Sequence, residues 1–398
     1  MKDRDTERKK LRIAMICDPI GNYKAGAIIS VLRFSDLLQK IGHRVVFIGA
    51  RSKENPTHDY HGGMKVYRFR SIPVPKSGGW RSAFPTVKEV KKILQDEDID
   101  IVHVILPMSG AIVAVKAAQA LGIKIVAHSH SQPENLFMDI PKFLGRRVLD
   151  RLWNKYLAWL YSKAESVIYP SEMGYRLLHH LTPEGKPHMI ISNGVDVNMY
   201  KPVDVGDFYT RFNIPKHTVN IIYVGRLFPE KSVDTLIKAV PHIIAIHPEI
   251  HVIIVGIGYL RSKLEALTAA LGVEDHVTFL TLNDEDKILA YSVGDIFVSP
   301  SFAELEGMTV LEAMACGKPI IVPDATMNAA RFFVTDNGFL FETTNHKDLS
   351  EKVLRLITDI KLRKQMGEAS LATSKKYDIN RSVSKLEALY HSLMNDEQ

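Results

Sequence analysis

Short apolar runs alternate with amphipathic segments along the first half of the chain. The apolar runs have the length of buried strands and lie at residues 12–17, 44–49, 100–106 and 124–127. Helical periodicity occurs between them, at residues 28–40 and 112–121. Strands that alternate with helices are typical of a parallel sheet that is covered on both faces. The first half is therefore predicted to be a doubly wound α/β domain.

The same alternation starts again in the second half. Apolar runs lie at residues 220–225, 251–255, 277–282, 296–298 and 319–323, and helical patterns at residues 308–316, 348–366 and 381–394. The turn-forming pair Asn193-Gly194 separates the two halves. The pattern predicts an N-terminal domain over residues 1–200 and a C-terminal domain over residues 201–380.

The composition agrees with two soluble domains. The chain has 398 residues, of which 46% are hydrophobic. No apolar run approaches the roughly 18 residues that a membrane span needs. Residues 1–12 are charged and lack the apolar segment of a signal peptide, so we expect a cytosolic protein. The two cysteines, Cys17 and Cys316, are expected to be free buried thiols.

Basic residues are concentrated in the first half of the chain. Residues 1–200 contain 30 Lys and Arg against 19 Asp and Glu, a net charge of +11, whereas residues 201–398 contain 21 against 26, a net charge of −5. A basic domain favours an anionic membrane surface, an anionic substrate or a nucleic acid. Because no helix-turn-helix, zinc-finger or RNA-recognition motif is present, we expect no nucleic-acid partner.

Residues 298–319, VSPSFAELEGMTVLEAMACGKP, combine a strand end, a polar loop and a helix that Gly317 would terminate. A helix N-terminus presents unpaired N–H groups that suit a diphosphate. Glu304 in the loop and Glu312 in the helix can accept hydrogen bonds from sugar hydroxyls. The stretch predicts a nucleotide-sugar site. The alternative is that Glu304, Glu306 and Glu312 are solvated.

A second group of candidate residues follows the strand at residues 220–225. Arg226 can bind two phosphate oxygens and Lys231 can add a point charge, so both suit a diphosphate. The alternative is a surface ion pair between Arg226 and Glu230. The next strand ends in a turn with two glycines, Gly256 and Gly258, which would give a nucleotide room near the backbone.

Two further patterns have the spacing of metal ligands. His128 and His130 lie two apart at a strand end and share a face, but a lone His-x-His is weak evidence for a metal, and structural histidines are the alternative. Asp98-Ile99-Asp100 lies in an acidic run before a strand. We interpret it as a solvated helix end.

The stretch at residues 298–319 resembles the signature of the retaining glycosyltransferases of family four, which have the GT-B fold. The matching residues are Pro300, Ser301, Glu304, Gly307, Leu311, Glu312, Ala313, Met314, Ala315, Gly317 and Pro319. VGRLFPEK at 224–231, VGIG at 255–258 and NGVD at 193–196 resemble other motifs of this family. The resemblance implies two Rossmann-like domains with a cleft between them, and a last helix within residues 381–398 that crosses back to the first domain.

The resemblance also implies the reaction. A hexose would pass from a nucleotide diphosphate sugar, expected to be a UDP-sugar such as UDP-glucose, to an acceptor hydroxyl that attacks the face from which the diphosphate leaves. No metal or other cofactor would be required. His130 would stabilise the sugar in the transition state, and Glu304 would orient it. The residues expected to bind the donor are Gly26, Gly225, Arg226, Lys231, Gly256, Gly258, Glu304, Gly307, Met308, Thr309 and Glu312.

The chain departs from the family pattern in three segments. Leu305 and Glu306 replace the usual glycine and aromatic residue, and Ala25 replaces the first of two glycines. Residues 324–338 lack the usual glycine-rich run with a glutamate. Donor contacts are expected to differ there. The variant ELEGMT at residues 304–309 is closer to family members that glycosylate lipids.

Residues 141–164 are predicted to form an amphipathic helix. Basic residues recur every four positions, and aromatic residues lie on its apolar stripe. Such a helix suits an anionic membrane surface, and the irregular segment before residue 85 is a second candidate. The alternative is a domain helix that buries its apolar face. The expected acceptor or membrane contacts are Trp80, Arg147, Arg151, Trp153 and Lys155.

Three functions compete on these patterns. The first is a peripheral membrane glycosyltransferase that modifies a lipid such as diacylglycerol or a phospholipid head group. The second is a soluble glycosyltransferase that acts on a small sugar or a polysaccharide precursor. The third is a non-catalytic protein that binds nucleotide sugars. Because the charged motif residues are all present, an enzyme is favoured.

Overall fold

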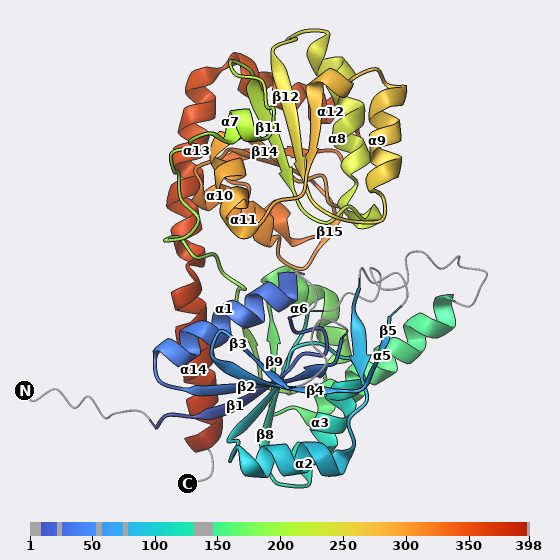
Figure 1. Ribbon diagram of the computed structural model, residues 1–398, viewed down its shortest axis with the longest axis vertical. Helices are drawn as coiled ribbons and strands as arrows, with labels where there is room; N and C mark the ends of the chain where they lie inside the picture. Colours follow the sequence, from blue (N-terminus) through green and yellow to red (C-terminus); the bar gives the residue numbers. More distant parts are fainter. Residues whose placement is uncertain (1–8, 22–25, 53–57, 75–78, 131–145, 396–398) are drawn as a thin grey trace, which may run out of the picture. The chain divides into compact units, whose positions relative to one another are not determined.

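The structure is a computed structural model that describes residues 9–21, 26–52, 58–74, 79–130 and 146–395. The chain divides into two compact units (Figure 1). Unit 1 comprises Met1–Pro170, Gly174–Ile191 and Val383–Gln398, and unit 2 comprises Ser171–Met173 and Ser192–Ser382. The chain therefore crosses between the units more than once.

Unit 1 contains an eight-stranded sheet in the order β10-β9-β8-β7-β1-β2-β4-β3. The strands are β1 (Arg12–Ile16), β2 (Arg44–Ala50), β3 (Asp59–His61), β4 (Met64–Phe69), β7 (Ile101–Val104), β8 (Lys124–His128), β9 (Ser166–Tyr169) and β10 (His188–Ile190). All neighbours are parallel except β3 and β4. A separate antiparallel hairpin is formed by β5 (Ser71–Pro73) and β6 (Arg81–Ala83). Doubly wound parallel order is thus confirmed for this half of the chain.

Helices lie on both sides of the sheet of unit 1, with α1 on one side and α2 and α3 on the other (Figure 1). The helices are α1 (Gly26–Lys40), α2 (Val87–Asp96), α3 (Ser109–Gln119), α5 (Arg146–Lys163), α6 (Glu172–Leu178), η2 (His179–Leu181) and α14 (Ile379–Asn395), although the first residues of α6 and α14 belong to unit 2. Because both faces are covered, strands such as β7 are buried along their whole length and lack an alternating pattern.

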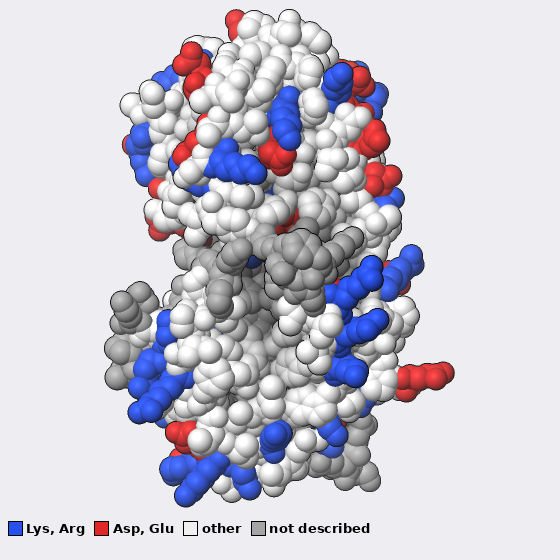
Figure 2. All heavy atoms as spheres, turned by 90° about the vertical axis from the view of Figure 1, so that its right-hand side faces the viewer, with Lys and Arg blue, Asp and Glu red and all other residues white. Residues whose placement is uncertain are grey.

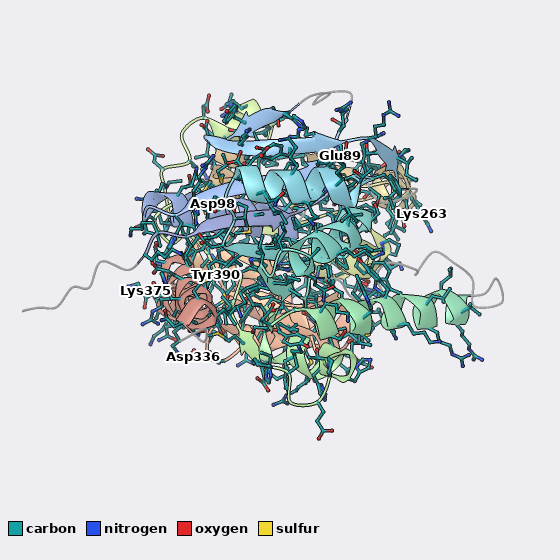
Figure 3. All side chains as sticks on the ribbon, turned by 90° about the horizontal axis from the view of Figure 1, so that it is seen from below. Glu89, Asp98, Lys263, Asp336, Lys375 and Tyr390 are labelled. Atoms are coloured by element: carbon teal, nitrogen blue, oxygen red, sulfur yellow. The ribbon has the colours of Figure 1, made fainter. Side chains whose placement is uncertain are left out.

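The segment Asp98-Ile99-Asp100 before β7 is not simply a solvated helix end. Asp98 is exposed, but the side chain of Asp100 is only 7% exposed (Figure 3 labels Asp98). Arg12 pairs with both carboxylates, and its backbone N–H donates to Asp100 Oδ2 over 2.8 Å. The interpretation as a solvated end was therefore wrong for Asp100, which fixes β1 beside β7.

Unit 2 contains a six-stranded parallel sheet in the order β13-β12-β11-β14-β16-β18. The strands are β11 (Val219–Val224), β12 (Ile250–Val255), β13 (Val277–Leu280), β14 (Ile296–Val298), β16 (Ile320–Pro323) and β18 (Gly338–Phe341), and a short ladder joins β15 (Ala303–Glu304) to β17 (Met327–Asn328). The first strand of the unit, β11, lies between β12 and β14. The strand order therefore reverses between β11 and β14. From the ends of these two neighbouring strands, the chain continues toward opposite edges of the sheet.

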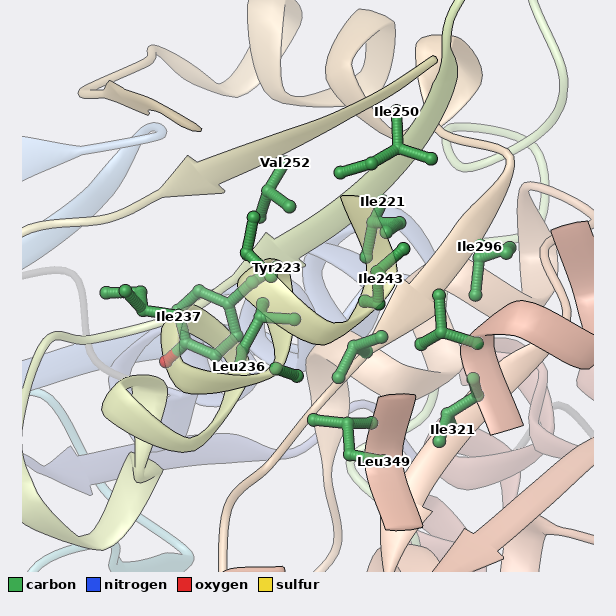
Figure 4. Packing of buried hydrophobic residues seen from close by; sticks show 14 of the residues in the cluster. Ile221, Tyr223, Leu236, Ile237, Ile243, Ile250, Val252, Ile296, Ile321 and Leu349 are labelled. Atoms are coloured by element: carbon green, nitrogen blue, oxygen red, sulfur yellow. The ribbon is translucent and has the colours of Figure 1, made fainter. Parts of the chain in front are cut away.

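Two hydrophobic clusters cover the two faces of this sheet. One joins the strands to α8 (Val233–Ile244), α9 (Arg261–Ala270) and α12 (His346–Thr358), as Figure 4 shows for Leu236, Ile237 and Leu349. The other joins them to α7 (Phe208–Arg211), α10 (Asp284–Val293) and α11 (Met308–Ala315). The remaining elements are η3 (Pro229–Lys231), η4 (Glu274–His276), η5 (Ala329–Phe333), α13 (Ile360–Ser374) and η6 (Lys375–Tyr377).

The helix predicted over residues 348–366 is two helices. α12 ends at Thr358 and α13 begins at Ile360. Asp359 between them accepts a hydrogen bond from the Leu362 N–H over 2.8 Å, which caps the second helix. Hydrophobic periodicity continues across this junction, so the pattern alone did not separate the helices.

The thiol prediction is confirmed, since Cys17 and Cys316 are both buried and free. In the described part of the chain, no helix combines the length and apolar character that a membrane span requires.

Candidate functional site

The predicted donor residues of unit 2 lie where β11, β12 and β14 end. Because β11 and β14 are neighbours, the loop after β11 and the loop at residues 299–307, here called the acidic loop, start side by side. The two loops are in contact: the Phe302 N–H and the Ser301 hydroxyl both donate to the carbonyl oxygen of Glu230, each over 3.1 Å. The reversal of strand order thus brings the two candidate groups together, as ligand sites in such sheets require.

An ion pair joins the two loops directly. Lys231 Nζ lies 2.5 Å from Glu304 Oε1, and both side chains are mostly buried, with 13% and 17% exposed. The pair joins residues that are 73 positions apart. The structure therefore places the predicted phosphate-binding lysine directly beside the predicted sugar-binding glutamate.

Arg226 makes the ion pair that was considered as the alternative to phosphate binding. Its guanidinium lies 2.9 Å from Glu230 Oε1 and stacks 4.7 Å from the ring centroid of Phe228. Glu230 is buried, so this is not a simple surface pair. Arg226 itself remains 32% exposed, and its guanidinium has a fixed orientation at the end of β11.

Glu312 on α11 is buried rather than solvated. Its Oε2 accepts a hydrogen bond from the Tyr291 hydroxyl over 2.9 Å and lies 3.6 Å from Lys287 Nζ. Burial, and then the Glu312 charge, hold the pKa of Tyr291 well above its usual value, so this phenol remains a donor. Glu306 is also buried. The solvated alternative was therefore wrong for Glu306 and Glu312.

Backbone approaches at this end of the sheet require glycine. A Cβ on Gly256 would lie 1.9 Å from the Gly225 carbonyl oxygen, and one on Gly258 would lie 2.3 Å from the Leu227 carbonyl oxygen. Gly307 has φ +106° and precedes Met308, the first residue of α11. Its conformation turns the acidic loop into the helix, and the first amides of α11, from Met308 and Thr309, point away from the helix body.

Three histidines of unit 1 form a stack. The rings of His103 on β7 and His128 on β8 are 5.5 Å apart and 2° from parallel, and those of His128 and His130 are 3.8 Å apart. At one end, the hydroxyl of Tyr390 from α14 lies 2.6 Å from His103 Nδ1 (Figure 3 labels Tyr390). The sequence indicated His130 but not the stack, because the strand pairing that aligns His103 with Val126 places it beside His128.

All three histidines of this stack are neutral at physiological pH. Burial lowers the pKa of His103 and of His130 to about 3, and it lowers that of His128 well below the usual value. His130 is partly exposed as a whole residue, but its Nε2 is buried. A neutral imidazole can donate or accept a hydrogen bond, but it cannot supply a proton as an imidazolium.

The stack predicts an acid-sensitive unit 1. An unfolded histidine binds a proton below about pH 6.5. The folded residues do not, so stability falls as pH drops through 6.5. Replacing His128 by Phe keeps a ring in the stack and removes one group that binds a proton in the unfolded chain but not in the folded one. We compare the free energy of unfolding of H128F with that of wild type at each pH. Between pH 8 and pH 5, this difference is expected to shift by about 2 kcal/mol in favour of H128F. Urea unfolding at both pH values measures this.

An exposed histidine provides the control for that experiment. His180 lies in η2 and is exposed. H180F is expected to show the same difference from wild type at both pH values. An H128F variant that loses stability equally at pH 5 and pH 8 would contradict a neutral histidine stack.

Asp18 is a candidate residue that the sequence analysis did not single out. It lies two residues after the end of β1, is 1% exposed, and its Oδ2 accepts hydrogen bonds from the backbone N–H of Ala83 (2.8 Å) and Gly110 (3.3 Å). Burial raises its pKa to about 7. The available signal was an acidic residue at the carboxyl end of the first strand, beside the point where the order of this sheet reverses.

The other predicted residues of unit 1 do not converge on one site. Gly26 opens α1 and is exposed, and residues 22–25 lie outside the described residues. Trp80 precedes β6 and is half-buried. In α5, Arg147, Arg151 and Lys155 are exposed and Trp153 is half-buried. Residues 141–145 of the predicted helix lie outside the described residues.

One group within the described residues has the spacing of a metal site. His43, Glu387 and His391 place one ligand atom each within 4.8 Å of one another. However, His43 Nδ1 accepts a hydrogen bond from the Leu11 N–H over 3.0 Å, so Nε2 carries the proton of the neutral ring. That nitrogen lies 3.2 Å from Glu387 and acts as a donor to it. The group is better explained as a hydrogen-bonded contact of α14.

The fold and the site of unit 2 define a nucleotide-binding type of α/β protein, with charged groups and a helix N-terminus at the reversal of strand order. Two family models match the chain: Glycosyltransferase Family 4 over residues 25–199 and Glycosyl transferases group 1 over residues 209–372. The chain belongs to this glycosyltransferase family, as the sequence motifs predicted.

Curated relatives of this chain are glycosyltransferases. It is 29% identical to a GDP-mannose-dependent alpha-mannosyltransferase of Mycolicibacterium smegmatis, over 79% of this chain and 80% of the relative. It is 25% identical to a phosphatidyl-myo-inositol mannosyltransferase of the same organism, over 89% of this chain and 86% of the relative.

Solved structures confirm the predicted GT-B fold. Sucrose-phosphate synthase from Thermosynechococcus elongatus aligns with a TM-score of 0.83 at 20% identity, over 97% of this chain and all of that chain. Anabaena HepE in complex with UDP-glucose aligns with a TM-score of 0.77 at 19% identity, over 96% of this chain and all of that chain.

Proposed function

We propose that this protein is a retaining, metal-independent hexosyltransferase that moves a sugar from a nucleotide diphosphate sugar to a hydroxyl of a membrane lipid. The observation that carries the donor half of this proposal is the ion pair between Lys231 and Glu304 at the reversal of strand order in unit 2. One partner suits phosphate and the other suits sugar hydroxyls, so the boundary between the diphosphate and the sugar would lie at this pair.

The charges of unit 2 can stabilise a departing diphosphate without a metal. Lys231 and Arg226 supply two positive charges, and the N-terminus of α11 adds aligned amides. The Glu312 carboxylate, oriented by Tyr291, is the proposed acceptor for ribose hydroxyls. In the retaining reaction, the acceptor hydroxyl attacks the face that the diphosphate leaves, and a donor phosphate oxygen takes its proton. Neutral His130 would assist by hydrogen bonding to the sugar.

Support for a lipid acceptor comes from the exposed half of α5. Its C-terminal half packs into unit 1 through Leu157, Leu160 and Tyr161, so that half is a core helix. Its N-terminal half exposes Val148 and Leu152, 56% and 58%, next to three exposed basic residues. Apolar and basic side chains together suit the interface of an anionic membrane. Figure 2 shows Lys and Arg outnumbering Asp and Glu on the face of unit 1 turned to the viewer.

Release of nucleoside diphosphate tests the proposal directly. The purified protein would be incubated with UDP-glucose, UDP-N-acetylglucosamine or GDP-mannose, with and without anionic vesicles that contain diacylglycerol or phosphatidylinositol. We expect one donor to be consumed at least tenfold faster with lipid. The product should be a glycolipid with the anomeric configuration of the donor, and EDTA should not slow the reaction. The uridine prediction would be contradicted by turnover with GDP-mannose alone.

The role of α5 has its own prediction. The variant R147E/R151E/K155E is expected to reduce sedimentation with anionic vesicles at least fivefold, because three attractive charges become repulsive. The matched control K88E/K92E/K116E makes the same charge change at exposed positions of α2 and α3 and should bind almost as wild type. Equal losses in both variants would indicate nonspecific attraction to the net charge of unit 1.

A second candidate function is a glycosyltransferase with a soluble acceptor. A relative of nearly the same length is an N-acetyl-alpha-D-glucosaminyl L-malate synthase, 24% identical over 98% of this chain and 99% of the relative. Turnover that is unchanged by vesicles but stimulated by a small hydroxylated acid or sugar would favour this function and leave the donor site as proposed.

A further inference from the structure

The acidic loop at residues 299–307 is attached at both ends. Its first half is attached to η3 and β17: besides the contacts with Glu230, the Asn328 side-chain amide donates to the Ser301 carbonyl oxygen over 2.7 Å. Asn328 is completely buried. The start of the loop is therefore fixed by the sheet region of unit 2, and only its second half depends on contacts elsewhere.

The second half of the loop is attached to the two segments where the chain enters unit 2. The Ser171 hydroxyl donates to the Leu305 carbonyl oxygen over 2.5 Å, and the Asn193 N–H donates to Glu306 Oε2 over 2.9 Å. Ser171 and Ser192 are the first residues of unit 2 after each departure from unit 1. Two consecutive residues of the loop are thus held by the two entry segments.

The Asn193 segment is itself rigid. Gly194 has φ +70°, and a Cβ there would lie 2.7 Å from Ile379 Cα. The Val195 N–H donates to the Tyr377 carbonyl oxygen over 2.8 Å, and the Ile379 N–H donates to the Val195 carbonyl oxygen over 3.0 Å. A shift of residues 192–195 would therefore be transmitted to Glu306 of the acidic loop, which this segment holds.

Glu306 is the buried side chain in this connection. It is 3% exposed, and besides the Asn193 N–H it forms hydrogen bonds with the side chains of Ser192 and Asn193. Within the described residues, no Lys or Arg forms an ion pair with it. Burial raises its pKa to about 7 despite these hydrogen bonds, so the carboxyl is protonated below that value. The neighbouring phenol of Tyr377 has a raised pKa and stays neutral.

We propose that Glu306 is a positioning residue, which fixes Gly307 and the start of α11 for donor binding by tying the acidic loop to the entry segment at residues 192–195. Gly307 follows Glu306 directly and precedes Met308, the first residue of α11, so a displacement of Glu306 moves the start of that helix, whereas Glu304 is held separately by β17 and Lys231. This inference rests on the proposed donor site of unit 2. It assigns a role to a residue at which the chain departs from the family pattern.

The positioning role of Glu306 predicts that donor affinity depends on pH. Protonated Glu306 still accepts a hydrogen bond from the Asn193 N–H over 2.9 Å and carries no buried charge. Ionised Glu306 is a buried charge that, among the described residues, has hydrogen-bond donors but no Lys or Arg partner. It would also lie beside the start of α11, where the diphosphate is proposed to bind. Donor affinity should therefore decrease above pH 7.

The test compares the variant E306Q with wild type. UDP and GDP binding would be measured by calorimetry at pH 6.0 and 8.5, together with hydrogen exchange of residues 299–307. We expect the wild type to lose about tenfold more affinity than E306Q between these pH values, because glutamine keeps the acceptor and cannot ionise. Titration of the nucleotide is common to both proteins and cancels. E351Q, at an exposed position of α12, should behave as wild type.

A second variant removes the acceptor. E306L cannot accept from the Asn193 N–H and is expected to speed exchange of the acidic loop at least fivefold at both pH values. The same pH dependence in E306Q and wild type, or unchanged exchange in both variants, would overturn the positioning role. If neither nucleotide binds wild type or any variant, but E306L still speeds exchange, the proposed donor site is wrong while the contact between the acidic loop and the entry segment is supported. If E306L does not fold, the E306Q comparison decides.

Discussion

Replacing Lys231 by alanine is expected to lower kcat/KM by about 100-fold to 1,000-fold, or about 3 to 4 kcal/mol of transition-state stabilisation. The change removes a positive charge at the proposed diphosphate position. It also leaves Glu304, whose side chain is only 17% exposed, without its ion-pair partner. Steady-state release of nucleoside diphosphate with the preferred donor measures the effect, and a thermal melt checks folding.

The matched control is Lys238→Ala. Lys238 also pairs with a carboxylate, Asp234, over 2.7 Å, but it lies on the exposed side of α8 with 44% of its side chain accessible. Because exposed pairs within a helix contribute little, K238A should keep activity within a factor of two. A folded K231A enzyme with activity like that of K238A would place the diphosphate elsewhere.

Replacing Gly256 by alanine is expected to destabilise unit 2 by more than about 3 kcal/mol and to abolish nucleotide binding. The new Cβ would lie 1.9 Å from the Gly225 carbonyl oxygen. That oxygen belongs to the backbone, which cannot rotate away as a side chain can. The ends of β11 and β12, which flank the proposed donor site, would have to separate. Urea unfolding and calorimetry with UDP and GDP measure the two effects.

Gly272→Ala separates crowding from backbone strain. Gly272 has φ +65°, but a Cβ there would meet nothing within 4 Å. Its substitution should therefore cost only about 1 to 2 kcal/mol from the left-handed conformation and leave nucleotide binding intact. Similar losses for G256A and G272A would show that the close approach of Gly256 to Gly225 relaxes easily and does not support the site.

Local patterns were sufficient for most elements of the fold. The apolar runs at residues 12–17, 44–49 and 251–255 became β1, β2 and β12, because a strand buried on both faces needs a continuous apolar run. The single helix predicted at residues 348–366 failed for a local reason that periodicity does not report. Asp359 caps a new helix there, while the apolar spacing continues through the junction.

The candidate site was predicted in its members but not in its contacts. Motif spacing identified Lys231, Glu304 and Glu312, and the resemblance grouped them around a donor. It did not indicate that Lys231 pairs with Glu304 or that Tyr291 holds Glu312. It also gave no role to Glu306 or Asp18, because whether a carboxyl is solvated or buried depends on residues that are distant in sequence.

The sequence by itself determined the two α/β units, the positions of the glycines at strand ends, the charge difference between the halves and the glycosyltransferase family. These follow from local periodicity, composition and short motifs, which act over a few residues. Only the tertiary structure decided which charges meet, which histidines stack and which carboxyls are buried. Many of those contacts join residues that are distant in sequence, such as His103 with His128, 25 positions apart, and Asn193 with Glu306, 113 positions apart. They depend on the order of strands in each sheet, which local periodicity does not encode.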